Sequence, residues 1–234
     1  MESAAGSTRA TTASRARCWR SVMGGSFLGL AEFARRRGEL DEAVEAIEEA
    51  RRLFDAGGVR WGRAMGANIL AEVRRAQGDL EAAAAGYREA LEVFVAIGAT
   101  HAIFPEINLS VVLIERARSD EARQCLEATL GSLARRHMED LAGELHCCLL
   151  PCVAADGDWE AWDRHASTGI ALLKSTGSVD PDTAKVAGLA ASLVAEAGHP
   201  DRARTAYTLA IAQLRALGRD ADEAAMLEAK LSLP

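Results

Sequence analysis

The 234-residue chain has a net charge of −7 and a hydrophobic content of 49%, yet only 5% of its residues are aromatic. The negative charge argues against general nucleic-acid binding, which needs a basic surface to displace counterions from phosphates. Abundant alanine with few aromatic residues favours closely packed helices, because alanine has the highest helix propensity. No stretch alternates β-branched and polar residues as a half-buried strand does.

One short motif recurs along the chain at a nearly constant interval. It is a turn residue, usually glycine, followed by the start of a helix, as in the hexapeptide Gly78-Asp79-Leu80-Glu81-Ala82-Ala83. The motif begins, at spacings of 39 to 41 residues, at Gly38, Gly78, Ala117, Gly157 and Gly198. A second series with the same period fits the left-handed position that ends many helices, and consists of Gly58, Gly98, Gly177 and Gly218. A fixed period of this size indicates a solenoid of stacked repeats.

Residues 1–15 contain serine, threonine, alanine and glycine with scattered arginines and show no apolar period, so we predict a disordered tail. Residues 16–234 are predicted to form the solenoid. Each repeat is expected to be a helix, a short turn and a second helix, because its apolar residues recur at three- and four-residue steps. The predicted repeats are 24–58, 59–98, 99–138, 139–177 and 178–218. Residues 220–233 are expected to add an amphipathic helix that caps the last repeat.

The second repeat resembles a tetratricopeptide repeat. The pattern that carries the resemblance is Leu70-Ala71, Gly78-Asp79-Leu80, Ala83, Tyr87 and Ala90-Leu91. The first repeat matches it at Leu30-Ala31, Gly38, Ala43, Ile47 and Ala50, and the fifth at Ala191, Gly198, Ala203, Tyr207 and Ala210. The common repeat has 34 residues, so the chain resembles the longer variant found in kinesin light chain and in large bacterial regulatory ATPases and protein kinases.

This resemblance covers roughly residues 24–218 and implies an all-α fold. The expected architecture is a right-handed α-α superhelix of five helix-turn-helix repeats with a C-terminal capping helix. Repeats three and four depart from the pattern. Ala117 replaces the turn glycine, and Trp162 stands where a small alanine belongs, with Gly169 expected to make room for it.

By the resemblance, one face of each first helix lines a concave groove that binds a partner segment. The predicted groove residues are Glu32, Arg35, Arg36, Asn68, Glu72, Arg75, Phe104, Ile107, Val111 and Glu115. In one interpretation, the arginines hold carboxylates of an acidic peptide and Asn68 holds its backbone. In the other, this is an ordinary solvated face on which Glu32–Arg36 and Glu72–Arg75 form helical salt bridges worth roughly 0.2–0.5 kcal/mol each.

The sequence offers a weaker candidate for metal or redox chemistry in the fourth repeat, at His146, Cys147, Cys148 and Cys152. Cys148 and Cys152 share a helix face at a spacing that a metal site can use. No second pair of ligands follows them, and cysteine is also a common small core residue, so we expect core packing and no metal or cofactor. No nucleophile turn or glycine-rich phosphate loop occurs, so we expect no enzyme activity.

The sequence therefore predicts a non-catalytic scaffold of a bacterial signalling or regulatory system that binds a protein or peptide partner. The alternative is a ligand- or peptide-sensing regulatory domain of a transcription regulator or protein kinase. No apolar run is long enough to span a bilayer, so we expect a cytoplasmic protein that binds neither membrane nor nucleic acid. A homodimer formed through an uncapped N-terminal repeat is a further expectation.

Overall fold

The computed structural model describes residues 2–134 and 138–218 together with 225, 227 and 230. Over these residues the chain forms ten α-helices and one 3₁₀ turn, and no strand. None of these helices is both long and apolar enough to cross a membrane. The helices fall into two compact units, the first ending at Leu109 and the second beginning at Ser110.

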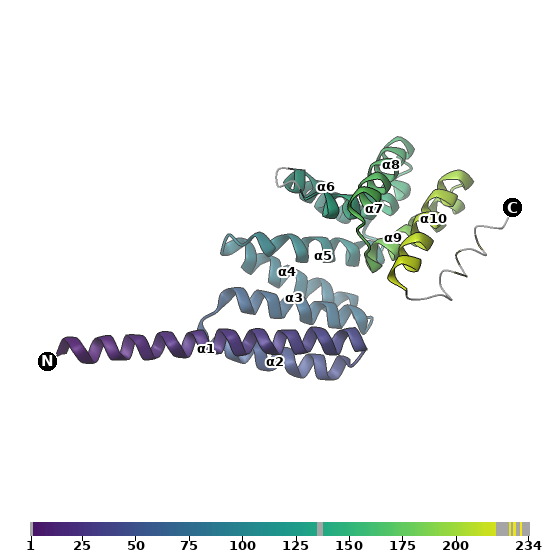
Figure 1. Ribbon diagram of the computed structural model, residues 1–234. Helices are drawn as coiled ribbons and strands as arrows, with labels where there is room; N and C mark the ends of the chain where they lie inside the picture. The colour runs from purple at the N-terminus through teal and green to yellow at the C-terminus, as the bar shows by residue number, and fades with distance from the viewer. Residues whose placement is uncertain (1, 135–137, 219–224, 226, 228–229, 231–234) are drawn as a thin grey trace. The chain divides into compact units, whose positions relative to one another are not determined.

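Unit 1 consists of stacked helix pairs (Figure 1). α1 packs against α2 and α3 against α4, and α3 also contacts both α1 and α2. The elements are α1 (Glu2–Arg37), α2 (Leu40–Gly57), α3 (Arg60–Ala76), α4 (Leu80–Ala96), η1 (Thr100–Ala102) and the part of α5 (Ile103–Glu115) that ends at Leu109. Gly38, Gly58, Gly78 and Gly98 have positive φ and follow the ends of α1 to α4.

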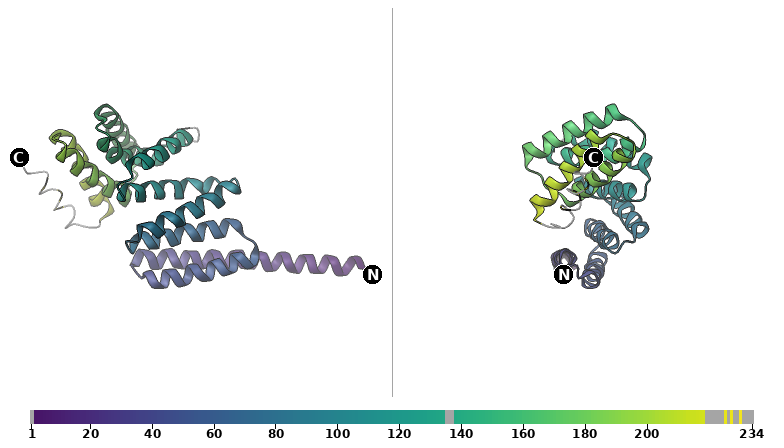
Figure 2. Two further views of the ribbon diagram at one scale, coloured as in Figure 1. Left: turned by 180° about the vertical axis from the view of Figure 1, so that it is seen from behind. Right: turned by 90° about the vertical axis from the view of Figure 1, so that its right-hand side faces the viewer.

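Unit 2 repeats this arrangement (Figure 2). α7 pairs with α8 and α9 with α10, while the first helices α7 and α9 contact each other and α6 contacts α7. The elements are the rest of α5, α6 (Ser119–Ala134), α7 (Glu139–Ala155), α8 (Trp159–Thr176), α9 (Pro181–Glu196) and α10 (Pro200–Leu217). The predicted all-α class and the helix-turn-helix repeats are thus confirmed.

The N-terminus differs from the sequence prediction. Residues 1–15 were expected to be disordered, but α1 begins at Glu2 and extends past the end of its partner α2 (Figures 1 and 2). The segment contains no proline and several alanines, so a helix can continue into it. An absent apolar period indicates that a helix buries no face; it does not show that no helix forms. The predicted capping helix at 220–233 lies outside the described residues except at three positions, of which Leu227 is buried in the unit 2 core.

Small residues let the paired helices approach closely. The alanines at the repeat positions are buried, namely Ala43, Ala50, Ala83, Ala90, Ala203 and Ala210. In unit 1 the ring of Phe54 from α2 fits against glycines of two other helices. A Cβ atom added at Gly62 of α3 would lie 2.3 Å from Phe54 Cδ1, and one at Gly24 of α1 would lie 2.7 Å from Phe54 Cε1. These glycines allow one aromatic ring to fill the space between three helices.

We predict that Gly62→Ala lowers the free energy of unfolding by about 2 kcal/mol, because overpacking a core outweighs the gain in helix propensity. The matched control is Gly131→Ala in α6, where an added methyl group meets nothing within 4 Å. The control should be neutral or stabilising by up to about 1 kcal/mol. Urea denaturation of both variants checks this, and equal effects would contradict the packing argument.

The turn that begins each repeat motif needs a left-handed residue. Glycine supplies it with φ values of 79° at Gly38, 83° at Gly78, 70° at Gly157 and 81° at Gly198. In the third repeat Ala117 takes this position with φ of 55° and is the one non-glycine residue with positive φ in the described chain. A left-handed conformation costs a residue with a Cβ atom roughly 1–2 kcal/mol.

We therefore predict that Ala117→Gly stabilises the protein by about 0.5–1 kcal/mol, since the relief of strain exceeds the added entropy of the unfolded glycine. The reciprocal change Gly78→Ala should destabilise by a similar amount. Thermal and urea denaturation measure both effects. A loss of stability in Ala117→Gly would show that the turn is not strained.

Candidate functional site

Polar side chains on three successive first helices meet in unit 1. Arg35 of α1 makes a two-point ion pair with Glu32, with Nε–Oε2 and Nη2–Oε1 distances of 2.8 Å. Its Nε also lies 3.3 Å from Oε2 of Glu72 on α3. Asn68 Nδ2 donates to Glu72 Oε1 at 2.9 Å, and Asn108 Nδ2 of α5 lies 3.4 Å from the same oxygen. Glu72 therefore connects α1, α3 and α5.

The contacts between Glu32 and Arg35 favour the charged form of each side chain. Burial alone would raise the pKa of Glu32, but hydrogen bonds from Arg35 and Arg36 bring it below its ordinary value. The Glu32 hydrogen bond, followed by the charge of Glu72, raises the pKa of Arg35. Because Glu32 and Glu72 both lie within ion-pair distance of Arg35, the network is held by charge-assisted contacts.

Asn68 has an acceptor without a partner. Its side chain is only 6% exposed, and Oδ1 is buried with no hydrogen-bond partner among the described residues. Its orientation follows from Glu72, whose carboxylate can accept only from Nδ2. Leaving a buried acceptor unsatisfied costs about 1–3 kcal/mol. Such exceptions are rare in folded proteins and call for an explanation.

The structure brings together part of the predicted groove. Glu32, Arg35, Asn68 and Glu72 form the network, and Arg36 joins it through a 2.6 Å bond from Nε to Glu32. The predicted Glu32–Arg36 salt bridge is therefore present.

Arg75 of α3 and Ile107 of α5 are half-buried. Phe104 is 47% exposed and turns toward the ring of His101, 6.2 Å away.

Two predicted groove residues lie beyond Leu109 and belong to unit 2. Val111 is 0% exposed, so its placement on an open surface was wrong. α5 carries apolar residues on most of its circumference, and its hydrophobic pattern does not indicate which face is buried. Glu115 is nearly buried and accepts from Lys185 of α9 at 2.8 Å. Neither residue is available to a partner as the prediction required.

Asn108, the repeat equivalent of Asn68, was not among the groove residues predicted from the sequence. The two asparagines are 40 positions apart, one repeat period, on α5 and α3. That spacing was the available signal, because residues one period apart occupy equivalent positions on neighbouring first helices. The amides and Glu72 thus form one row across two repeats.

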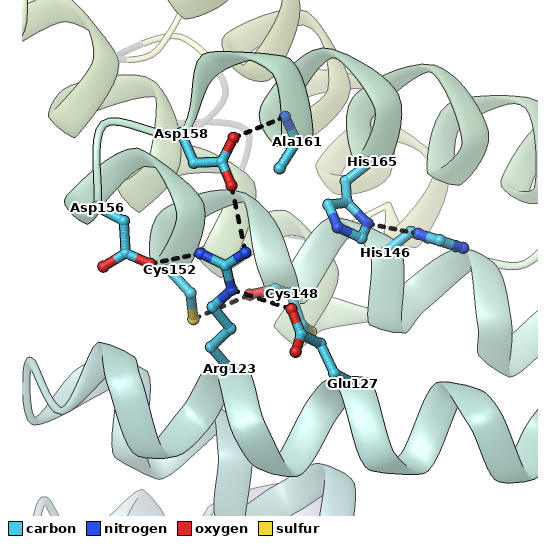
Figure 3. Close-up of polar contacts among 9 residues, drawn as sticks. All are labelled: Arg123, Glu127, His146, Cys148, Cys152, Asp156, Asp158, Ala161 and His165. Carbon is cyan, nitrogen blue, oxygen red and sulfur yellow. Dashed lines mark hydrogen bonds and ion pairs between the residues drawn. The ribbon is translucent and has the colours of Figure 1, made fainter.

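A second polar cluster lies in unit 2, where Arg123 of α6 reaches the α7–α8 turn (Figure 3). Its guanidinium contacts Glu127 at 3.0 Å, Asp156 at 2.6 Å and Asp158 at 3.3 Å. Asp158 also caps α8 by accepting from the Ala161 N–H, and this bond, ahead of Arg123, lowers the Asp158 pKa. The cluster joins α6 to the next repeat, and each nitrogen of the Arg123 guanidinium has an acidic partner.

Near this cluster, His146 of α7 and His165 of α8 contact each other through their Nδ1 atoms at 2.7 Å (Figure 3). At that distance one nitrogen donates and the other accepts, so the pair is compatible with two neutral rings. Burial, followed by the charge of His146, lowers the pKa of His165 to about 4. Burial and then Arg164 lower the pKa of His146.

The cysteines of the fourth repeat are core residues. Cys147, Cys148 and Cys152 are buried, and burial raises the pKa of Cys147 and of Cys152 to about 12 and that of Cys148 well above its ordinary value. A protonated thiol is a poor nucleophile and a poor metal ligand. Over the part of the chain that the structure describes, no three histidine, cysteine or acidic side chains gather as a metal ion would need.

Comparisons with known proteins agree with this architecture. No model of a protein family matches the sequence, and no curated protein matches it. Several solved structures match closely in fold. The kinesin light chain TPR-like repeats of Podospora anserina give a TM-score of 0.61 at 16% identity, over 86% of this chain and 99% of that one.

Two further solved structures give similar matches. A Rap protein complexed with competence and sporulation factor gives a TM-score of 0.66 at 13% identity, over 88% of this chain and 57% of that one. A signal-transduction ATPase from Pyrococcus horikoshii, which carries a tetratricopeptide-repeat sensor, gives 0.67 at 15% identity, over 89% of this chain and 32% of that one. The chain has the tetratricopeptide-repeat fold.

In this fold, the row formed by Asn68, Glu72 and Asn108 lies on consecutive first helices of tetratricopeptide-type repeats. The alanines that match the tetratricopeptide pattern lie in the helix-pair cores. Trp162, which replaces one of them, is buried in unit 2. Gly169 was expected to make room for Trp162. A Cβ atom added at Gly169 would lie 2.8 Å from Sγ of Cys147, so the helix that comes close to this glycine is α7.

The histidine pair predicts a pH dependence of stability. His165 has a folded-state pKa of about 4, below the usual 6.5, so the unfolded chain takes up a proton that the folded chain excludes. The contribution of neutral His165 to the free energy of unfolding is complete above pH 6.5 and is lost as the pH falls from 6.5 toward 4. Arg164, Arg123 and His146 oppose its protonation, and Glu127 favours it.

We expect the free energy of unfolding to fall by about 1–2 kcal/mol between pH 7 and pH 5 because of this residue. The measurement is guanidinium denaturation at a series of pH values, comparing wild type with His165→Leu. The slope against pH should be shallower in the variant, whatever its absolute stability. Identical slopes would contradict the assignment.

Proposed function

We propose that the chain is a non-catalytic protein-interaction module of a bacterial signalling or regulatory system. It binds an extended segment of a partner protein on the first-helix face of unit 1. The observation that carries the proposal is the row of two repeat-equivalent asparagines joined by Glu72. Side-chain amides can donate to carbonyls and accept from N–H groups of a backbone, whatever the side chains of the bound segment.

The buried acceptor of Asn68 supports this proposal. Its Oδ1 has no partner among the described residues, so a backbone N–H of a bound segment would satisfy it. The atom is closed off from solvent, and a bound segment must therefore displace a neighbouring side chain to reach it. Asn108 and Glu72 are half-buried and remain within reach from the surface.

Arg35 and Arg36 differ in how accessible they are to a partner. Arg35 is engaged by Glu32 and Glu72, so it organises the row and is not a free cation. Arg36 is 68% exposed along its side chain although it contacts Glu32. It is the groove cation that a partner carboxylate can approach most readily, by competing for one exposed ion pair.

The second candidate is a sensor that binds a short peptide or metabolite and transmits the change to an attached domain. Two matched structures favour it by their descriptions, one being a Rap protein complexed with a factor and the other an ATPase with a tetratricopeptide-repeat sensor. A thermal-shift screen against peptides and metabolites separates the candidates. A small-molecule or short-peptide hit supports the sensor, and capture of a protein partner without such a hit supports the scaffold.

We predict that Asn68→Ala combined with Asn108→Ala weakens partner capture by ten-fold or more, since each lost hydrogen bond in a desolvated site contributes about 1 kcal/mol. Affinity capture from the source cell, followed by titration with the recovered segment, is the measurement. The control is Lys174→Ala, at an exposed position of α8 in unit 2, and this variant should bind the partner as wild type does. Unchanged capture by the folded double variant would refute the proposed face.

A further inference from the structure

One face of α1 is apolar and exposed. Four large side chains on it are each between 58% and 63% exposed, namely Trp19, Val22, Leu30 and Phe33. We call them the α1 stripe. At about 3.6 residues per turn, their separations of 3, 8 and 3 positions place them along one side of the helix. The opposite side of α1 packs on α2 and α3 through Leu28, Ala31 and Ala34.

The stripe is too apolar to be an ordinary solvated surface. The aromatic side chains of Trp19 and Phe33 offer roughly 150–250 Å² each, and Val22 and Leu30 add smaller aliphatic areas. With all four more than half exposed, the stripe presents on the order of 400 Å² of apolar area. This approaches the largest apolar patch of a typical monomer, about 300–600 Å², which commonly marks an interaction site. It is also about half of the roughly 800 Å² that each partner buries in a standard interface.

The order of residues in the stripe is symmetric about Ser26. Trp19 lies seven positions before Ser26 and Phe33 seven after it, while Val22 lies four before and Leu30 four after. If a second α1 runs antiparallel with the two Ser26 residues level, Trp19 comes level with Phe33 and Val22 with Leu30. A self-complementary patch of this kind is what a two-fold symmetric dimer requires.

The centre of the stripe is suited to close approach of a helix. Gly25, Ser26 and Gly29 are exposed, and a Cβ atom added at either glycine would meet nothing within 4 Å. Small residues let a second backbone come near, so that the large residues at both ends can interlock around them. Because the glycines have no intramolecular packing role, the space beside them is available to another helix.

The charges beside the stripe permit this pairing. Arg37 bonds Glu39 at 2.8 Å and lies over the Phe33 ring at 5.6 Å. In the antiparallel arrangement Arg15 of one copy comes level with Arg37 of the other, whose charge Glu39 already balances. No pair of uncompensated like charges therefore meets at this end.

We infer that α1 pairs with α1 of a second copy of this chain, antiparallel and with the two-fold axis at Ser26. The inference is independent of the proposed function, because Glu32 and Arg35 lie on the part of α1 that is partly buried against α3. The dimer covers the α1 stripe and does not involve the row formed by Asn68, Glu72 and Asn108.

The first test is the mass of the purified full chain in solution, measured by sedimentation velocity at tens of micromolar. Wild type should be a dimer, and Val22→Glu combined with Leu30→Glu should be a monomer with the same helix content. Val95→Glu on α4, where the native side chain is 62% exposed, should remain dimeric. A monomeric wild type, or a charged variant that stays dimeric, would overturn the inference.

The second test fixes the register by disulfide formation in a Cys18→Ser background, since Cys18 is the exposed cysteine of the described chain. Ser26→Cys should cross-link rapidly to its copy, because both residues lie at the axis. Leu30→Cys should cross-link slowly, since four positions from the axis place its two copies about 12 Å apart along the helix. Cross-linking at Leu30 as fast as at Ser26 would exclude the antiparallel register.

Discussion

The close approach of helices at small residues is the constraint on which this structure depends. A ring as large as Phe54 fits between three helices only because Gly24 and Gly62 present no side chain to it. Ala43 and Ala50 have the same role along the α1–α2 pair. A helix pair held this closely is thin and cannot cover its own apolar surface, so each pair is stabilised by stacking against the next.

That stacking also creates the polar row of unit 1. Asn68 reaches Glu72 because the two lie one helical turn apart on α3. Asn108, one period after Asn68, occupies the equivalent position on α5 and reaches Glu72 across the repeat boundary. Glu72 can therefore bridge adjacent helices, and Arg35 of the preceding first helix, α1, pairs with its carboxylate. The row that we propose as a binding surface is therefore a product of the repeat geometry, and its spacing depends on the same alanines and glycines that set the distances in the core.

Local signals in the sequence predicted the helix pairs, and through them most of the fold. A left-handed turn favours glycine, and a close contact between helices requires a small residue such as alanine. The residue types at Gly78 and Ala83 were therefore enough to predict the turn and the helix contact. The site was less accessible because its contacts join residues of different helices. The burial of Val111 could not be inferred from a helix that is apolar on nearly all sides, and the contact between His146 and His165 depends on how α7 crosses α8.

α1 shows how one helix can serve two surfaces at once. Glu32 and Phe33 are neighbours in the sequence, yet one side chain belongs to the polar row and the other to the apolar stripe. Successive helical residues point about 100° apart, so a single turn presents both faces without conflict. The remaining sector carries Ala31 and Ala34 into the core. A change in α1 must therefore be interpreted by its sector. Core substitutions alter folding, whereas substitutions in the row test the proposed partner binding and those in the stripe test the inferred self-association.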